Sequence, residues 1–173
     1  MNMKKLLMVA AFAFAGAISA VAQKTAVVDM SYILKNVPMY ESANEQLKQV
    51  SEKWQKEVEN KNNEAQVLYK NYQTESVFYS DEMKTKKENE IVAKEKEAND
   101  LKRKYFGPQG ELFKKRESLM KPIQDEVYAA IKDVAEKNGY SIILDKASAQ
   151  NLIYYSSKVD ISDQILSKLG YAK

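Results

Sequence analysis

A thin apolar stripe runs through a long charged segment of this chain and limits what the chain can fold into. From Glu41 to Asn138 the residues favour helix, and charged side chains occupy most helical faces. In the first half of the segment, apolar residues recur at steps of three, four or seven: Leu47, Val50, Trp54, Val58, Ala65, Leu68 and Tyr72. This spacing places them on one narrow face of a helix. Such a stripe predicts packing against one partner helix rather than within a globular core.

The stripe fades between Val77 and Asp81 and then resumes. Its second half consists of Met83, Ile91, Ala98, Leu101 and Tyr105. The simplest interpretation is that the chain turns back on itself as a long antiparallel helical hairpin, a coiled-coil arm with its tip near residues 77–82. Ser80 or Asp81 would cap the returning helix. The sole tryptophan, Trp54, is expected to pack between the two helices.

Two interruptions are expected in the returning half of the arm. The first is Phe106-Gly107-Pro108-Gln109-Gly110, and the second is Pro122. They predict an arm that is bowed or able to flex, as would suit an arm bounding a cavity; a purely structural kink is the alternative. Beyond Pro122 the stripe becomes wider and more aliphatic, which predicts packing on a body: Ile123, Val127, Ala130, Ile131 and Val134.

The segments flanking the arm predict a small body of the α+β class. Ala26 to Asp29 ends a short β-branched run, and Tyr140 to Asp145 is a second apolar strand that should pair with it. Asn151 to Tyr155 is interpreted as a third strand, and the last helix is expected from Ile161 to Leu169. The body would therefore be one small mixed sheet with helices.

The N-terminus has the three parts of a secretory signal peptide. Lys4 and Lys5 precede an apolar run, and Ala20-Val21-Ala22 forms a small-x-small cleavage site. Cleavage after Ala22 is expected, and an uncleaved anchor is the alternative. The expected division is residues 1–22 as signal peptide, 23–40 and 139–173 as body, and 41–138 as arm.

Cleavage also changes the charge balance. Removing two lysines takes Lys+Arg from 27 to 25 against 24 Asp+Glu, so the formal charge falls from +3 to +1. Because the arm alternates its charges and lacks a concentrated basic field, a nucleic-acid partner is not expected. The lysine runs of the arm are interpreted as solvated faces.

Catalytic chemistry has little support in the sequence. The chain contains neither cysteine nor histidine, which excludes thiol and imidazole catalysis, disulfides and the usual zinc ligand sets. Asp29 and Asp145 each end a predicted strand, but turn residues explain them better than a catalytic carboxylate pair. We therefore predict no enzyme, no cofactor and no metal site.

The order of these segments resembles the Skp/OmpH family of periplasmic chaperones. The features that carry the resemblance are the Lys-Thr-Ala-Val-Val-Asp-Met strand, the charged hairpin, the Ile-Ile-Leu-Asp strand and the closing Asp-Ile-Ser-Asp-Gln-Ile-Leu helix. The resemblance implies a periplasmic homotrimer whose sheets join into a central body, with the arms as tentacles around a cavity. It also implies an ATP-independent holdase that binds unfolded outer-membrane β-barrel proteins. The near-neutral mature chain departs from the markedly basic members, so no lipopolysaccharide site is carried over.

The arm would hold such clients by many weak apolar contacts, with avidity among three arms. Aromatic residues crowd at the tip, where an exposed cluster would bind polypeptides and a buried one would merely close the hairpin. The client-binding candidates are Tyr69, Tyr72, Val77, Phe78, Tyr79 and Met83. A peripheral contact of the tip with a membrane is left open. The alternatives are a coiled-coil spacer or envelope tether, which predicts an elongated dimer, and an enzyme, which predicts a well-formed pocket in the body.

Overall fold

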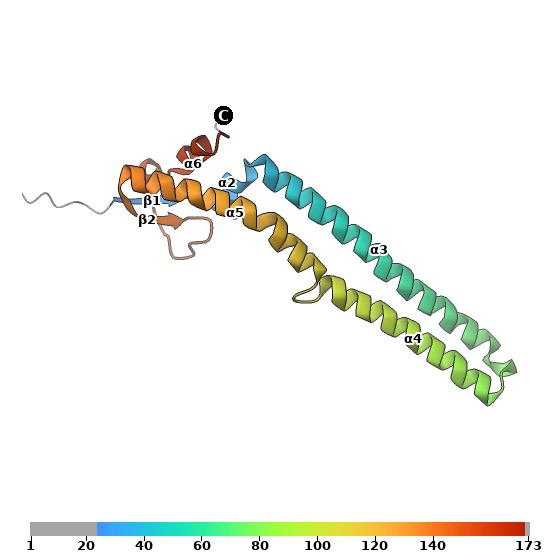
Figure 1. Ribbon diagram of the computed structural model, residues 1–173. Coiled ribbons are helices and arrows are strands. Elements are labelled where there is room, and N and C mark those ends of the chain that lie inside the picture. Colours follow the sequence, from blue (N-terminus) through green and yellow to red (C-terminus); the bar gives the residue numbers. More distant parts are fainter. Residues whose placement is uncertain (1–23, 172–173) are drawn as a thin grey trace, which may run out of the picture.

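In the computed structural model, which describes residues 24–171, a long two-helix arm extends from a small body (Figure 1). The elements, in chain order, are β1 (Lys24–Val28), α2 (Met30–Lys35), α3 (Pro38–Glu75), the 3-10 turn η1 (Ser76–Phe78), α4 (Asp81–Phe106), α5 (Glu111–Asn138), β2 (Tyr140–Asp145), the 3-10 turn η2 (Ser157–Val159) and α6 (Ser162–Lys168). The predicted signal peptide and its cleavage site lie outside the described residues. The α+β class is confirmed, and the division between body and arm at Glu41 and Asn138 stays a prediction.

The predicted antiparallel hairpin is confirmed. Helix α3 is about 57 Å long at about 1.5 Å per residue, and α4 and the first turns of α5 run back alongside it (Figure 1). Most of the buried arm residues belong to the predicted stripe: Ala43, Leu47, Val58 and Ala65 in α3, and Ile91, Ala98 and Tyr105 in α4. Trp54 packs between the helices as expected, its ring stacked on that of Tyr105. Met83 is an exception, because it lies exposed in the first turn of α4.

The loop between α4 and α5 is the predicted interruption, and it is tightly folded. Gly107 donates its N–H to the carbonyl oxygen of Arg103 at 2.9 Å, and Gly110 donates to that of Gly107 at 2.9 Å. A Cβ on Gly107 would lie 2.4 Å from the Arg103 oxygen, and one on Gly110 would lie 2.8 Å from the oxygens of Lys104 and Tyr105. Only glycine fits this close approach of the loop to the end of α4. Pro122, by contrast, lies inside α5 without ending it.

Strands β1 and β2 pair in parallel, which confirms the predicted partnership. The register sets Ala26 beside Ile143 and Val27 beside Leu144. A parallel pair needs a crossover connection, and here the entire arm serves as that connection. Gly139 adopts φ 70°, a left-handed conformation that ends α5 and turns the chain directly into β2.

The hydrophobic core lies where α5 crosses the sheet and α6. Helix α5 contributes the wider aliphatic stripe predicted beyond Pro122, and β1, α2 and α6 surround it (Figure 1). The buried members are Ala26, Val28, Ile33, Val37, Ala43, Ile123, Val127, Ala130, Val134, Ile161, Ile165 and Leu166. This core joins the root of the arm to the body, because it includes Ala43 from the start of α3 and Ile123 from α5, the helix that follows α4 into the body.

The predicted third strand at Asn151–Tyr155 is wrong. These residues form an irregular segment, and the sheet of the described residues has two parallel strands rather than the expected mixed set. The second edge of β1 is occupied instead by the chain just before α6, where Val27 bridges Asp160 and accepts the N–H of Ile161 at 3.0 Å. The apolar run pairs with neither strand, although β2 keeps a free edge, and Ile153 stands in solvent, 99% exposed.

Candidate functional site

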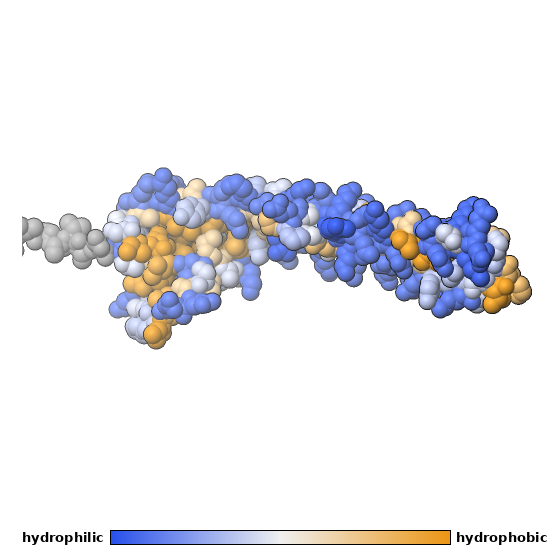
Figure 2. All heavy atoms as spheres, turned by 90° about the horizontal axis from the view of Figure 1, so that it is seen from below, coloured by the Kyte–Doolittle hydropathy of each residue, from blue (hydrophilic) through white to orange (hydrophobic). Residues whose placement is uncertain are grey.

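The tip of the arm presents two apolar side chains to solvent. The 3-10 turn η1 carries Val77 and Phe78 out of the apolar stripe, and Phe78 is 85% exposed. The turn is well defined because Ser80 caps α4, its hydroxyl oxygen accepting the N–H of Met83 at 3.3 Å. Apolar surface gathers at this end of the arm, whose visible surface is mostly hydrophilic (Figure 2). The tip therefore displays its apolar groups on an ordered turn.

The tyrosines of the tip have a different role. Tyr72 donates its hydroxyl to the carboxylate of Glu88 across the hairpin, and Tyr79 donates to Glu75. These hydrogen bonds raise the pKa of both tyrosines above the ordinary value. The two rings lie 6.3 Å apart in a tilted arrangement. Tyr72 and Tyr79 thus close the end of the hairpin beneath the exposed pair.

The six residues predicted to contact clients do not form one patch. Val77, Phe78, Tyr72 and Tyr79 lie together at the tip, and Met83 follows in the first turn of α4. Tyr69 lies earlier on α3 and is half exposed. Their role in binding stays a prediction, and Val77 and Phe78 are the most exposed of the six.

The body carries a second exposed apolar surface that the sequence interpretation missed. Ile142 and Leu144 of β2 are about half exposed, and Ile153 and Tyr154 extend from the loop that follows. Apolar groups cover much of the body in the view from below (Figure 2). This surface was not expected because the strand predicted at Asn151–Tyr155 would have covered part of it by pairing within the chain. The consecutive apolar residues Ile142, Ile143 and Leu144 were the available signal, because neighbouring residues of a strand face opposite sides and a sheet of this size buries only one of its faces.

A polar cluster lies at the carboxyl ends of the two strands. Lys146 donates to Asp160 at 2.8 Å and to the hydroxyl of Tyr155 at 3.1 Å, and its Nζ lies 3.5 Å from Asp29. The hydrogen bond that Lys146 donates to Asp160 raises the pKa of Lys146 above its ordinary value. Burial alone would raise the pKa of Asp160, but hydrogen bonds from Lys146 and Ser162 outweigh it and lower that pKa. The cluster ties the loop after β2 to the start of α6.

The two strand-end aspartates are structural, as the sequence favours. Asp29 accepts the N–H of Tyr32 at 2.8 Å and so caps α2. Asp145 accepts the N–H groups of Met30 at 3.1 Å and Ala147 at 3.0 Å. Both carboxylates are engaged by backbone donors, so they do not form a free acid/base pair.

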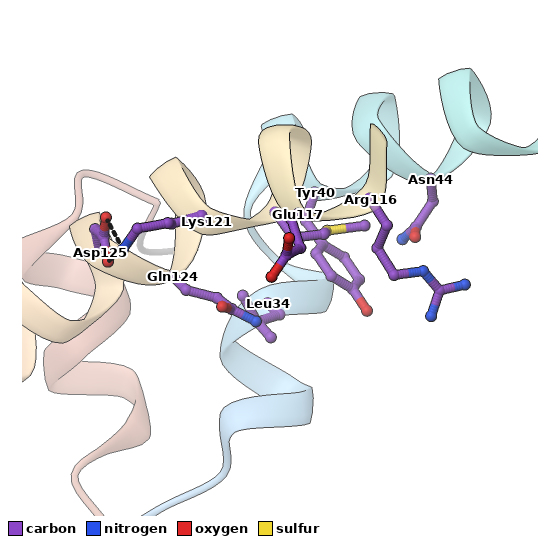
Figure 3. A pocket seen from close by; sticks show the side chains of 9 residues that line it. Leu34, Tyr40, Asn44, Arg116, Glu117, Lys121, Gln124 and Asp125 are labelled. Carbon is purple, nitrogen blue, oxygen red and sulfur yellow. Dashed lines mark hydrogen bonds and ion pairs between the residues drawn. The ribbon is translucent and has the colours of Figure 1, made fainter. Parts of the chain in front are cut away.

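A hollow of about 460 Å³, lined by apolar, polar and charged side chains, lies at the root of the arm between α2, α3 and α5 (Figure 3). It is lined by Leu34, Tyr40, Asn44, Arg116, Glu117, Met120, Lys121, Gln124 and Asp125. Lys121 and Asp125 pair with each other at 3.0 Å. Both charge signs occur around the hollow.

Neither a metal-binding cluster nor a membrane-spanning helix occurs in the part of the chain that the structure describes. Between residues 24 and 171, no group of three or more acidic side chains is placed to hold a metal ion. Over the same residues, every helix is too short or too polar to cross a bilayer. The exposed apolar surfaces at the tip and on the body are the main candidate functional surfaces.

These features define a class of protein: an α+β chain with a long helical-hairpin arm, which exposes apolar groups at the arm tip, on the body and at scattered positions along the arm. The chain belongs to the Skp/OmpH family, because the family model described as "Outer membrane protein (OmpH-like)" matches residues 24–169. The membership that the sequence resemblance implied is confirmed.

Relatives of known description agree with this assignment. The "Chaperone protein Skp" of Photorhabdus luminescens is 30% identical over 179 residues, covering 96% of this chain and 99% of the relative. The protein of the same name from Yersinia enterocolitica is 28% identical over 171 residues, with the same coverage. The crystal structure of a putative outer membrane chaperone (OmpH-like) from Caulobacter crescentus CB15 has a TM-score of 0.65 at 15% identity, covering 84% of this chain and 82% of that one. That likeness supports the fold alone.

Proposed function

We propose that this protein is an ATP-independent periplasmic holdase that binds unfolded outer-membrane β-barrel proteins and keeps them from aggregating. The observation that carries the proposal is the exposed Val77–Phe78 pair, held on an ordered turn at the far end of a charged arm. Unfolded barrel strands alternate apolar and polar side chains. An arm with scattered apolar groups among charges binds such strands weakly at each contact, without offering a core into which they could fold.

The proposal includes a homotrimer, and the exposed apolar surface of the body supports it. Ile142, Leu144, Ile153 and Tyr154 leave a solvent-facing patch beside the free edge of β2. Patches of this kind on small bodies are commonly covered by another chain. Three arms around one cavity would raise the affinity through avidity, since each contact after the first is intramolecular.

The remaining parts of the proposal follow from the family. The predicted signal peptide at residues 1–22 would export the chain to the periplasm, and the arm would comprise residues 41–138. No catalytic, cofactor or metal role is proposed, and binding to nucleic acid is not part of the function. A peripheral contact between the tip and a membrane would use the same Val77 and Phe78 side chains, so clients and lipid would compete for them.

The test uses the mature chain, residues 23–173, analysed by light scattering on its size-exclusion peak. It is run alone and after dilution of a urea-unfolded outer-membrane barrel into it. The expected result is a trimer that co-elutes with soluble barrel, and a Phe78→Ser variant that retains less of it. A monomer or dimer that leaves the barrel to aggregate would overturn the proposal and favour the coiled-coil spacer or envelope tether.

A further inference from the structure

A shallow groove lies on one face of the arm, between α3 and α4 and short of the tip. Its volume is about 670 Å³. It is lined by Asn60, Asn63, Glu64, Val67, Leu68, Glu90 and Lys94. Val67 and Leu68 supply its apolar surface, and Val67 is 57% exposed. A valine this exposed in the middle of a charged helix is available to another molecule.

The charged residues around the groove are already paired. The Glu64 carboxylate lies 3.1 Å from Lys61 and 3.4 Å from Lys94. Lys94 also lies 3.2 Å from Glu97, and Glu90 lies 3.1 Å from Lys87. Each lining charge therefore has a partner of opposite sign. The groove offers no uncompensated charge to an ionic ligand, so its complement is an uncharged apolar group.

We propose that this groove binds an apolar side chain of an unfolded polypeptide segment, as a client contact separate from the tip. The inference rests on the proposed function and places a second contact for the same client. Its occupant follows from the chemistry of an unfolded barrel strand, in which apolar and polar side chains alternate. One apolar side chain covers Val67 and Leu68, and its polar sequence neighbours point away from the groove into solvent, so the client buries no polar side chain there.

The position of the groove suits an extended client. Val67 precedes Val77 by about 15 Å along the arm at about 1.5 Å per residue. An extended chain covers that distance in about four or five residues at roughly 3.3 Å each. A single short client segment thus reaches from the groove to the tip, and two weak contacts act together.

The chain offers a closely matched control in Val92 of α4. It is 60% exposed, nearly the same as Val67, and it does not line the groove. Trp54 and Tyr105 stack across the hairpin. Val67 follows Trp54 by as many residues as Val92 precedes Tyr105, so the two valines lie at the same level of the hairpin. Val67 precedes the seam residue Leu68, whereas Val92 follows the seam residue Ile91. In antiparallel helices these offsets put the two valines on opposite faces of the arm.

The experiment measures the affinity of the mature chain and of Val67→Ser and Val92→Ser for a fluorescently labelled, urea-unfolded outer-membrane barrel after dilution. Circular dichroism checks that both variants keep their helix content. Val67→Ser is expected to weaken binding about fivefold, consistent with the loss of part of a buried valine contact, and Val92→Ser by less than about twofold. Equal losses, or a larger loss for Val92→Ser, would overturn the groove but leave the holdase function standing. A wild-type chain that does not bind the barrel would overturn the proposed function itself.

A crosslinking measurement tests the same contact without relying on affinity. The chain has no cysteine, so Val67→Cys and Val92→Cys each carry a single thiol for a benzophenone-maleimide label. The label at residue 67 is expected to crosslink to bound barrel in clearly higher yield than the label at residue 92. Equal yields would overturn the groove as a client contact.

Discussion

The rings of Trp54 and Tyr105 stack with their centroids 4.7 Å apart and their planes within 4° of parallel. Tyr105 lies in the last turn of α4, just before the glycine-rich loop, and its hydroxyl donates to Glu57 of α3 at 2.6 Å. One tyrosine thus joins the two helices by both stacking and hydrogen bonding, at the level where the returning helix is interrupted. The uninterrupted α3 supports the arm there.

Replacing Tyr105 with phenylalanine should lower the free energy of unfolding by about 1 kcal/mol, because it keeps the ring and removes the hydrogen bond to a carboxylate. Urea unfolding followed by the fluorescence of Trp54, the only tryptophan, measures the change. Tyr128→Phe is the control, since Tyr128 is largely exposed on α5. Equal changes for the two variants would show that the Glu57 bond does not stabilise the arm.

The loop between α4 and α5 should not tolerate a side chain at Gly107. Gly107→Ala is expected to lower the free energy of unfolding by about 1–3 kcal/mol, because the new Cβ would lie 2.4 Å from the Arg103 carbonyl oxygen. Gln109→Ala changes an exposed residue of the same loop and should have little effect. Thermal unfolding of the mature chain compares them. If Gly107→Ala is as stable as Gln109→Ala, the close approach does not exist in solution.

The Lys146–Asp160 pair should make the free energy of unfolding depend on pH in the acid range. The pKa of Asp160 is lowered in the folded chain, so the unfolded chain binds more protons as the pH falls. The stabilisation is complete above the ordinary aspartate pKa of about 4 and is lost as the pH drops through the lower folded value. Asp160→Asn should reduce stability at neutral pH and flatten this acid dependence. Urea unfolding midpoints measured between about pH 7 and 2 report both the stability at neutral pH and its acid dependence. If the midpoint of Asp160→Asn falls with pH as steeply as that of the unmodified chain, Asp160 is not the source of the acid dependence.

The exposed face of β2 should control the oligomeric state. Leu144→Asp is expected to dissociate the proposed trimer, because it would bury a charge without a partner at the contact between chains. Val92→Asp alters an exposed valine on the arm and should leave the trimer intact. Light scattering on the size-exclusion peak distinguishes them. An intact trimer in Leu144→Asp would place the interface elsewhere.

Much of the arm could be predicted because it depends on local patterns. The periodic stripe of α3 and α4, the Ser80 cap and the Gly139 helix end are each encoded within a few neighbouring residues. The sequence also indicated that Ala26 and its neighbours pair with the strand at Tyr140–Asp145, since these were the two most apolar short segments. The exposure of the tip did not follow in the same way: the sequence left open whether the cluster near Val77 and Phe78 is exposed or closes the hairpin, and the structure shows these two residues exposed.

The sequence by itself determined that a charged helical hairpin separates two strands, because helix periodicity and strand composition are local properties. Only the tertiary structure decided that Asn151–Tyr155 is not a strand, because strand pairing is a non-local property: the chain before α6 bridges β1, and this segment pairs with neither strand. The same holds for the cluster around Lys146 and for the groove at Val67. Both bring together residues separated along the chain or on two helices, and their packing cannot be inferred from either segment alone.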